Sequence, residues 1–342
     1  MNGFKNIKIL SFFWLFLNLS SAIFSQNSKN ETENSSSRPI SFKEVWGYVM
    51  IGEESSFSND YPITDVGYFV NAVNNFSDFI PVPSRKEKFP DYKGRIHLVS
   101  SVDSRAQTHL LLDPKLKLRD RIIRQLVKGC KDYDGLQIDW ELVMKEDDEN
   151  FWSFLKLLKR KLKGKMLTVA IPARLKTLER DAYDYAKLSK IVDKIIVMAY
   201  DEHWSTSTPG PIASVAWCKK IADYAKTVIP EDKLVMGCPF YSRAWSSLRW
   251  SSQAYRMYRL DDIIKANKVS VFKKSSDGDR SFSYDVKSTI TVFYDNVESS
   301  VQRCQSYKDN EISRLAFWRV GQEIPEFWKN LSITDENSSA GQ

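Results

Sequence analysis

Short apolar segments recur along the chain and alternate with longer amphipathic ones. The short segments are rich in β-branched and apolar residues, as expected for strands that are buried on both faces. Eight strands are predicted in this way, at 44–51, 64–70, 95–101, 134–139, 166–172, 192–200, 233–238 and 313–318. Helices are predicted between several of them, at 116–130, 147–163, 182–191, 211–228 and 298–307.

The segment 147–163 shows the helical pattern clearly, because its Phe and Leu residues recur at helical spacing with lysines on the opposite face. Strands that alternate with helices predict a parallel sheet, and eight of them in one domain predict a (β/α)₈ TIM barrel. The first two crossovers are short and loop-like. Residues 245–296 are too long for a simple crossover and contain a predicted helix near 258–266 and strand-like pieces at 269–272 and 289–293. We therefore expect a small α+β insertion between strands seven and eight.

The N-terminus has the three parts of a secretory signal. Lys5 and Lys8 precede an apolar run at 9–17, and small residues follow. We expect residues 1–25 to direct export to the periplasm, the cell surface or the exterior, and the same segment, if uncleaved, would tether the protein to a membrane. The predicted domain order is completed by a polar linker at 26–40, the barrel at 41–333 with its insertion at about 246–296, and a polar tail at 334–342.

Composition narrows the classes of partner. The chain has 342 residues and a net charge of +7, which is mild for this size and differs from the dense basic patch of a nucleic-acid-binding protein. Ten tryptophans are typical of clefts in which aromatic rings stack on sugars, although barrel cores also use aromatic residues. We predict a monomer without a nucleic-acid partner.

The cysteines and histidines do not predict a metal centre. They are Cys130, Cys218, Cys238, Cys304, His97, His109 and His203. The cysteine spacings fit no zinc or redox motif, and buried thiols are the favoured interpretation over disulfides. The histidines are scattered and have no carboxylate at ligand spacing, so neither a metal nor a cofactor is expected.

The segment 133–141, Tyr-Asp-Gly-Leu-Gln-Ile-Asp-Trp-Glu, carries candidate chemistry. Alternate side chains on a strand share a face, so Gln137, Asp139 and Glu141 should point together, inward at the C-terminal rim of a barrel. The Cα atoms of Asp139 and Glu141 would be about 6–7 Å apart. Two such carboxyls can share a hydrogen bond and protons, which would raise one pKa and make Glu141 a candidate general acid. The alternative, a structural acid pair that caps a helix, is less favoured in this apolar strand.

This segment resembles the Asp-x-x-Asp-x-Asp-x-Glu signature of glycoside hydrolase family 18, whose members include chitinases. Asp134, Asp139 and Glu141 match, and Gln137 takes the place of the second Asp. Three more stretches agree with the family pattern: Met198-Ala-Tyr-Asp201, Gly237-Cys-Pro-Phe-Tyr-Ser-Arg-Ala-Trp245 and Trp318. The resemblance covers roughly 43–328, and the segments around 199–211 and 317–323 look most like those of bacterial spore-cortex and peptidoglycan N-acetylglucosaminidases.

The resemblance implies a secreted hydrolase that cleaves β-1,4 bonds of polysaccharides containing N-acetylglucosamine by substrate-assisted retention. Glu141 would protonate the leaving oxygen and Asp139 would orient the substrate's acetamido group, whose oxygen attacks the anomeric carbon. Tyr200 and Asp201 would hold that group. The further substrate-binding candidates are Gln137, Trp318, Tyr241, Arg243, Trp46, Tyr48 and Met198.

Several of these roles have plain structural alternatives. Trp318, Trp46 and Tyr48 could fill the barrel core, and Arg243 could be a structural ion-pair residue. Gln137 cannot carry charge, so the acid should act with a pH profile different from that of the family pattern. A weak or inactive, lectin-like barrel and a surface interaction protein on the same fold stay open, and the presence of Glu141 favours an enzyme. The sequence does not decide between chitin and peptidoglycan.

Overall fold

The computed structural model describes residues 38–334, apart from 71–72, 75–77, 249–251, 277 and 287. The predicted signal at 1–25, most of the predicted linker and the tail after residue 334 lie outside the described residues. Within the described part of the chain, no helix is long and apolar enough to cross a membrane.

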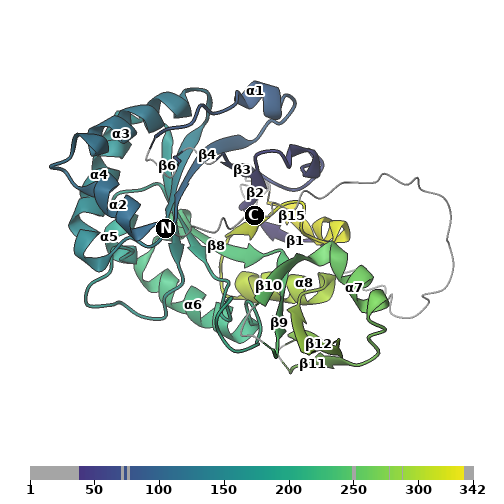
Figure 1. The fold of residues 1–342 in the computed structure, drawn as a ribbon. Helices are drawn as coiled ribbons and strands as arrows, with labels where there is room; N and C mark the ends of the chain where they lie inside the picture. The colour runs from purple at the N-terminus through teal and green to yellow at the C-terminus, as the bar shows by residue number, and fades with distance from the viewer. Residues whose placement is uncertain are drawn as a thin grey trace, which may run out of the picture. The chain divides into compact units, whose positions relative to one another are not determined.

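Eight parallel strands close into a barrel in the order β14-β2-β3-β4-β5-β6-β7-β8 (Figure 1). They are β2 (Glu44–Met50), β3 (Asp65–Phe69), β4 (Arg95–Val102), β5 (Gly135–Trp140), β6 (Met166–Pro172), β7 (Lys194–Met198), β8 (Leu234–Pro239) and β14 (Arg314–Trp318). All eight predicted strands are present, and the predicted (β/α)₈ fold is confirmed. Closure is made by β14, in which Leu315 pairs with Met236 of β8 on one side and with Val45 of β2 on the other.

The five predicted helices of the crossovers are also present. They are α3 (Lys117–Gly129), α4 (Asp148–Lys161), α5 (Tyr185–Ser189), α6 (Val215–Val228) and α8 (Val297–Asp309). The structure adds the short α1 (Arg85–Lys88) and α2 (Arg105–Leu112), which were not predicted. Helix α2 starts where the Ser104 hydroxyl accepts a hydrogen bond from the Gln107 backbone N–H, a usual N-cap. The 3₁₀ segments are η1 (Glu54–Ser56), η2 (Cys130–Asp132), η3 (Lys145–Asp147), η4 (Glu231–Lys233), η5 (Met257–Arg259) and η6 (Pro325–Asn330).

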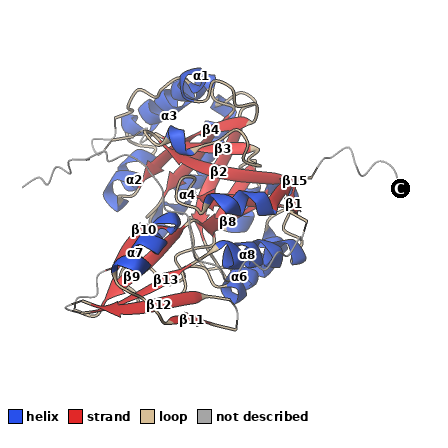
Figure 2. Ribbon diagram, turned by 90° about the vertical axis from the view of Figure 1, so that its right-hand side faces the viewer, coloured by secondary structure: helices blue, strands red, loops and turns tan. Residues whose placement is uncertain are grey.

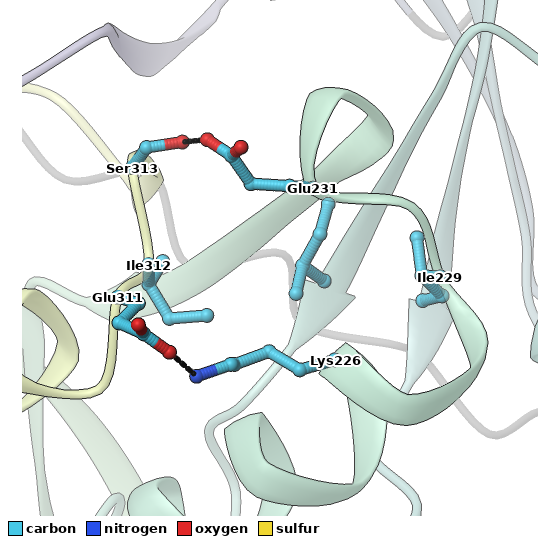
Figure 3. Close-up of a pocket in the computed structure, with 7 residues that line it drawn as sticks. Lys226, Ile229, Glu231, Glu311, Ile312 and Ser313 are labelled. Carbon is cyan, nitrogen blue, oxygen red and sulfur yellow. Dashed lines mark hydrogen bonds and ion pairs between the residues drawn. The ribbon is translucent and has the colours of Figure 1, made fainter.

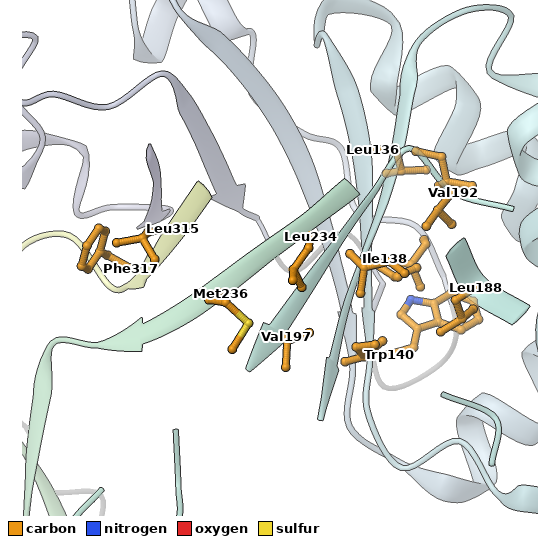
Figure 4. Packing of buried hydrophobic residues seen from close by; sticks show 14 of the residues in the cluster. Leu136, Ile138, Trp140, Leu188, Val192, Val197, Leu234, Met236, Leu315 and Phe317 are labelled. Carbon is orange, nitrogen blue, oxygen red and sulfur yellow. The ribbon is translucent and has the colours of Figure 1, made fainter. Parts of the chain in front are cut away.

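Alternation along each strand separates two hydrophobic layers. On β5, Leu136, Ile138 and Trp140 face outward into the large core between the strands and the helices (Figure 4). A smaller cluster fills the barrel interior and contains Trp46, Tyr48, Phe69, Val99, Ala170, Ile196, Val235 and Ala316. Gln137 and Asp139 occupy the other face of β5 and therefore point into the barrel, as the strand periodicity predicts.

The expected insertion forms a separate five-stranded antiparallel sheet in the order β10-β9-β13-β12-β11 (Figure 2). Its elements are β9 (Tyr241–Ser246), β10 (Ser252–Arg256), α7 (Leu260–Ala266), β11 (Phe272–Lys274), β12 (Arg280–Asp285) and β13 (Thr289–Tyr294). The sheet begins at Tyr241, before the expected boundary near 246. The strand predicted at 269–272 was wrong in position, since β11 starts only at Phe272 and pairs with β12.

A short parallel pair joins the two ends of the described chain, with β1 (Ile40–Phe42) alongside β15 (Leu331–Ile333). The pair takes Ile40 out of the predicted linker and into the folded unit. All four cysteines are buried free thiols, in agreement with the favoured interpretation.

Candidate active site

The carboxylate pair lies at the C-terminal end of β5. Asp139 is inside the strand, and the backbone N–H of Glu141 donates to the carbonyl of Val102 on β4, at 2.8 Å. The next residue, Leu142, has φ 59°, which is unfavourable for a bulky side chain. The chain thus turns sharply out of the barrel immediately after Glu141.

One side of the pair opens into a cavity of about 250 Å³, here called lobe A. Its lining residues are Asp139, Glu141, Met198, Tyr200, Asp201, Tyr241, Arg243, Ala254, Trp318 and Gln322. Eight of the eleven candidates from the sequence are therefore brought together. Ala254 and Gln322 were missed. Ala254 comes from β10 of the insertion, where no motif marked it, and Gln322 lies in the segment 317–323, whose resemblance was noted without a role for this residue.

A second cavity, lobe B, adjoins the first and measures about 510 Å³. Asp139, Glu141 and Trp318 line both lobes. The residues found only in lobe B are Met50, Phe69, Val73, Asn74, Ile80, Ser101, Val102, Asp103 and Gln107. The carboxylate pair thus stands in the middle of a cleft that extends to both sides.

The remaining three candidates, Gln137, Trp46 and Tyr48, line neither lobe. Gln137 is fully buried, and its amide nitrogen donates to the Tyr48 hydroxyl at 2.7 Å. Trp46 is also fully buried and stacks on His97, with ring centroids 4.4 Å apart. These side chains lie beneath the cleft, so the structural alternative fits Trp46, and Gln137 and Tyr48 support the site from below.

Asp139 is the most unusual titratable group of the cleft. Its side chain is buried, and its Oδ1 has no hydrogen-bond partner among the described residues. Burial, and then the charge of Glu141, raise its pKa to about 8. The effect of Glu141 on the pKa of Asp139 is that of its charge. Asp139 is therefore protonated at neutral pH.

Glu141 also has a raised pKa. The causes are desolvation first, then the negative charges of Asp201 and Asp103. The sequence assigned this effect to Asp139, which is itself neutral at rest, so the source of the shift differs from the expected one. A carboxyl that retains its proton closer to neutrality is suited to general acid catalysis.

Asp201 is held in a fixed orientation on the opposite wall of lobe A. Its Oδ1 accepts a hydrogen bond from the Tyr241 hydroxyl at 2.6 Å and another from Arg243 at 3.0 Å. Its backbone φ is 58°, a left-handed conformation that Asp tolerates better than most residues. Burial raises the pKa of the neighbouring Tyr200 far above its usual value, so its hydroxyl stays a neutral donor.

Trp318 combines packing with exposure to the cleft. Its ring lies edge-on to Phe69, with centroids 4.7 Å apart, and the half-buried side chain lines both lobes. The following Arg319 is ion-paired with Glu53, which also binds Arg256 of β10 at 2.8 Å. This link connects the loop after β14 to the loop after β2 and to the insertion.

A further cavity of about 280 Å³ lies at the opposite end of the barrel, near the start of β8 and β14 (Figure 3). Its charged groups are already paired, since Lys226 binds Glu311 at 2.6 Å and Ser313 donates to Glu231 at 2.8 Å. In TIM barrels chemistry takes place at the C-terminal end of the strands. The cleft around Asp139 and Glu141 is therefore the candidate active site.

A TIM barrel with a buried aspartate and an exposed glutamate at the end of one strand, which line a two-lobed cleft together with a tryptophan, defines a protein of the glycoside hydrolase type. The family comparison agrees with that class. The chain belongs to glycosyl hydrolases family 18, whose model matches residues 58–323.

Individual relatives are more distant. The chain is 30% identical over 224 residues to the uncharacterized glycosylase YvbX of Bacillus subtilis, covering 62% of this chain and 65% of that protein. The chain spans about half to two thirds of the length of the first curated relatives that it matches.

Two solved structures share the fold. The spore cortex-lytic enzyme SleL of Bacillus cereus has a TM-score of 0.76 at 19% identity, over 87% of this chain and 76% of that one. A Cycas revoluta family 18 chitinase in complex with (GlcNAc)4 has a TM-score of 0.68 at 18% identity, over 84% of this chain and 97% of that one.

Proposed function

We propose that this protein is an exported glycosidase that hydrolyses β-1,4 bonds in glycans containing N-acetylglucosamine, by substrate-assisted retention. The observation that carries the proposal is that Glu141 and Asp139 line both lobes of the cleft together with Trp318. Family membership supports the class of reaction. A glycan chain that crosses Trp318 would present its glycosidic bond to Glu141.

Glu141 acts as the general acid. Its raised pKa keeps it protonated closer to neutrality, and it faces both halves of the cleft, so it protonates the leaving oxygen. After the sugar departs, Glu141 is a carboxylate and accepts a proton from the attacking water. One residue therefore serves both half-reactions.

The nucleophile is the substrate's own acetamido oxygen. Asp139 is buried and protonated at rest, so it is a poor nucleophile but a good partner for the acetamido group. Tyr200 and the rigidly held Asp201 line the same lobe and restrain that group in the attacking geometry. Fixing a nucleophile within the substrate in this way lowers the entropic part of the barrier.

The substrate is tested directly by digesting chitin oligomers and purified peptidoglycan in parallel. We expect mass spectrometry to detect products ending in N-acetylglucosamine and proton NMR to show the β anomer first. Oligomers with a free amine on the reacting sugar should not be cleaved. Initial release of the α anomer, or rapid cleavage of fully de-N-acetylated oligomers, would contradict the mechanism. Absence of cleavage of every N-acetylated glycan would contradict the activity.

Export is inferred from the sequence of residues 1–25. The test is the location of the full chain in comparison with a variant in which Lys5 and Lys8 are replaced by Glu. We expect the first protein in the exported fraction and the second inside the cell. Retention of both inside the cell would contradict export.

A further inference from the structure

Lobe B is the larger part of the cleft, and the proposed reaction does not explain its lining. It shares Asp139, Glu141 and Trp318 with lobe A, so a glycan with one sugar over Trp318 can continue into it. Its volume of about 510 Å³ is within the usual range of pockets for small ligands, roughly 300–1,000 Å³. Lobe B can therefore hold the sugar next to the reacting one.

Lobe B is lined by both apolar and polar side chains. The apolar side chains are Met50, Phe69, Val73, Ile80 and Val102. They suit the hydrophobic face of a pyranose ring. The polar side chains are Asn74, Ser101, Gln107 and Asp103, and Asp103 is the only charged one among those that belong to lobe B alone.

Strand register places Asp103 beside the catalytic acid. Val102 of β4 pairs with Trp140 of β5, so the next residues, Asp103 and Glu141, stand opposite each other at the rim. Asp103 is exposed, and its carboxylate has no ion pair or hydrogen bond with the described residues. Its charge already acts on Glu141, whose pKa it helps to raise after the effects of desolvation and Asp201.

The charges around lobe B are one-sided. Its described lining includes no Lys, Arg or His. Of its three carboxyl groups, Asp139 is protonated at neutral pH and Glu141 is the proposed acid, so Asp103 supplies the negative charge. Arg243 of lobe A is already bound to Asp201. A bound carboxylate would be repelled here, and a bound cation would be stabilised.

We propose that lobe B binds a de-N-acetylated unit, a glucosamine whose protonated amino group pairs with Asp103, next to the reacting N-acetylglucosamine. The inference rests on the proposed function and specifies its substrate class. A partially de-N-acetylated glycan is then a better substrate than a fully acetylated one. A glycan with a free carboxylate at this position is a worse one.

The experiment is a digest of partially de-N-acetylated chitin at pH 6 and low ionic strength. Product ends are labelled and sequenced by mass spectrometry. We expect glucosamine to be enriched roughly threefold at one position flanking the cleaved bond, an effect of the size of an exposed ion pair. Salt at 0.5 M should reduce the enrichment in the wild type, because it screens the pair.

Two variants assign the effect. Asp103→Asn should bring the flanking position back to the random frequency. Asp132→Asn removes the same charge from an exposed residue before β5, at the opposite end of that strand from Glu141, and should retain the enrichment. If Asp103→Asn fails to fold, Asp103→Ser and the salt series on the wild type provide the same test.

The outcomes separate the two proposals. Random flanking positions in a wild type that hydrolyses acetylated oligomers would overturn the inference and leave the proposed function intact. Enrichment that persists in Asp103→Asn or at 0.5 M salt would overturn the role of Asp103. A wild type that cleaves no acetylated glycan would overturn the proposed function itself.

Discussion

The two ends of the barrel each hold a buried aspartate, and the two residues have opposite environments. Asp65, at the start of β3, accepts hydrogen bonds from Arg95 at 2.6 and 2.7 Å and pairs with His97 at 2.8 Å. Asp139, at the end of β5, has an oxygen with no partner among the described residues. The same residue type is thus fully satisfied at one end and left unsatisfied at the other.

Their pKa values follow this difference. Burial alone would raise the pKa of Asp65, but hydrogen bonds from His97 and Arg95 outweigh burial and hold it below its usual value. Burial and Glu141 raise the pKa of Asp139 to about 8. Removing the partners of a buried carboxylate destabilises the fold, so such a carboxylate has a structural role. A buried carboxyl without a partner is instead available to bind substrate.

The pattern extends beyond these two residues. At the start of the strands, Glu44 binds Lys194 at 2.7 Å and lies 3.3 Å from Arg314. At the other end, Glu141 has no cation within ion-pair distance among the described residues. The N-terminal end of the barrel is therefore expected to respond to mutation mainly in stability, and the C-terminal end mainly in activity.

The largest effect should come from Glu141→Gln. We expect kcat for N-acetylglucosamine oligomers to fall by roughly 10³–10⁴, since the general acid is lost, with a melting temperature that does not fall, because the neutral Gln removes the repulsion by Asp201 and Asp103. Glu149→Gln, at an exposed position on α4, is the matched control and should keep full activity. Steady-state kinetics and calorimetry measure both quantities. Hydrolysis near the wild-type rate in Glu141→Gln would remove this residue from the mechanism.

Asp65→Asn is the counterpart at the stable end. It leaves Arg95 and the buried His97 without their anionic partner, so we expect a loss of about 3 kcal/mol in the free energy of unfolding. Chemical denaturation measures it, with the exposed Asp91→Asn as control. Activity per folded molecule should change little. An unchanged unfolding midpoint would show that the ion pairs of Asp65 do not stabilise the barrel.

Much of this contrast could be anticipated from the sequence. The apolar runs predicted all eight barrel strands, because buried parallel strands have a strong local signal. Strand periodicity placed Gln137 and Asp139 in the barrel, and the family motif brought eight candidate residues to one cavity. These features depend on local pattern or on residues within one short motif.

The rest depends on contacts between distant segments. The residues found only in lobe B come from the ends of β2, β3 and β4, from the loops after them and from α2, and they share no motif. The missing donor to the Asp139 Oδ1 depends on side-chain orientation, which strand spacing does not determine. The sequence predicted the position of the insertion but not the order of its strands, because short, half-exposed antiparallel strands have only a weak hydrophobic pattern in the sequence.

The two aspartates should also give opposite pH dependences of stability. The pKa of Asp139 is raised on folding. Its contribution to the stability of the fold is therefore fully present below its pKa in the unfolded chain, near 4, and is lost as pH rises toward 8. Between pH 5 and 7 we expect the free energy of unfolding of the wild type to fall by about 1 kcal/mol per pH unit relative to that of Asp139→Asn.

The pKa of Asp65 is lowered on folding. Its contribution to stability is therefore present above its pKa in the unfolded chain and is lost as pH falls through its pKa in the folded protein. Relative to Asp65→Asn, the wild type should therefore lose stability toward acid. Denaturation curves of the three proteins at several pH values measure both differences. Parallel curves for the wild type and Asp139→Asn would show that Asp139 is not protonated in the folded protein.

The smallest effect concerns Asp201, a partnered carboxylate at the active end. Tyr241→Phe removes its 2.6 Å hydrogen bond but leaves Arg243 in place, so Asp201 should keep its ion pair and become less rigid. We expect kcat/KM to fall roughly tenfold, at the lower end of the range for one lost hydrogen bond to a charged group. The control is Tyr224→Phe, which removes a comparable hydrogen bond to Thr177 on the outer surface and should leave kcat/KM unchanged. A loss of stability without a loss of kcat/KM in Tyr241→Phe would mean that carboxylates with hydrogen-bond partners stabilise the fold at both ends of the barrel. Only Asp139 and Glu141 would then take part in the reaction.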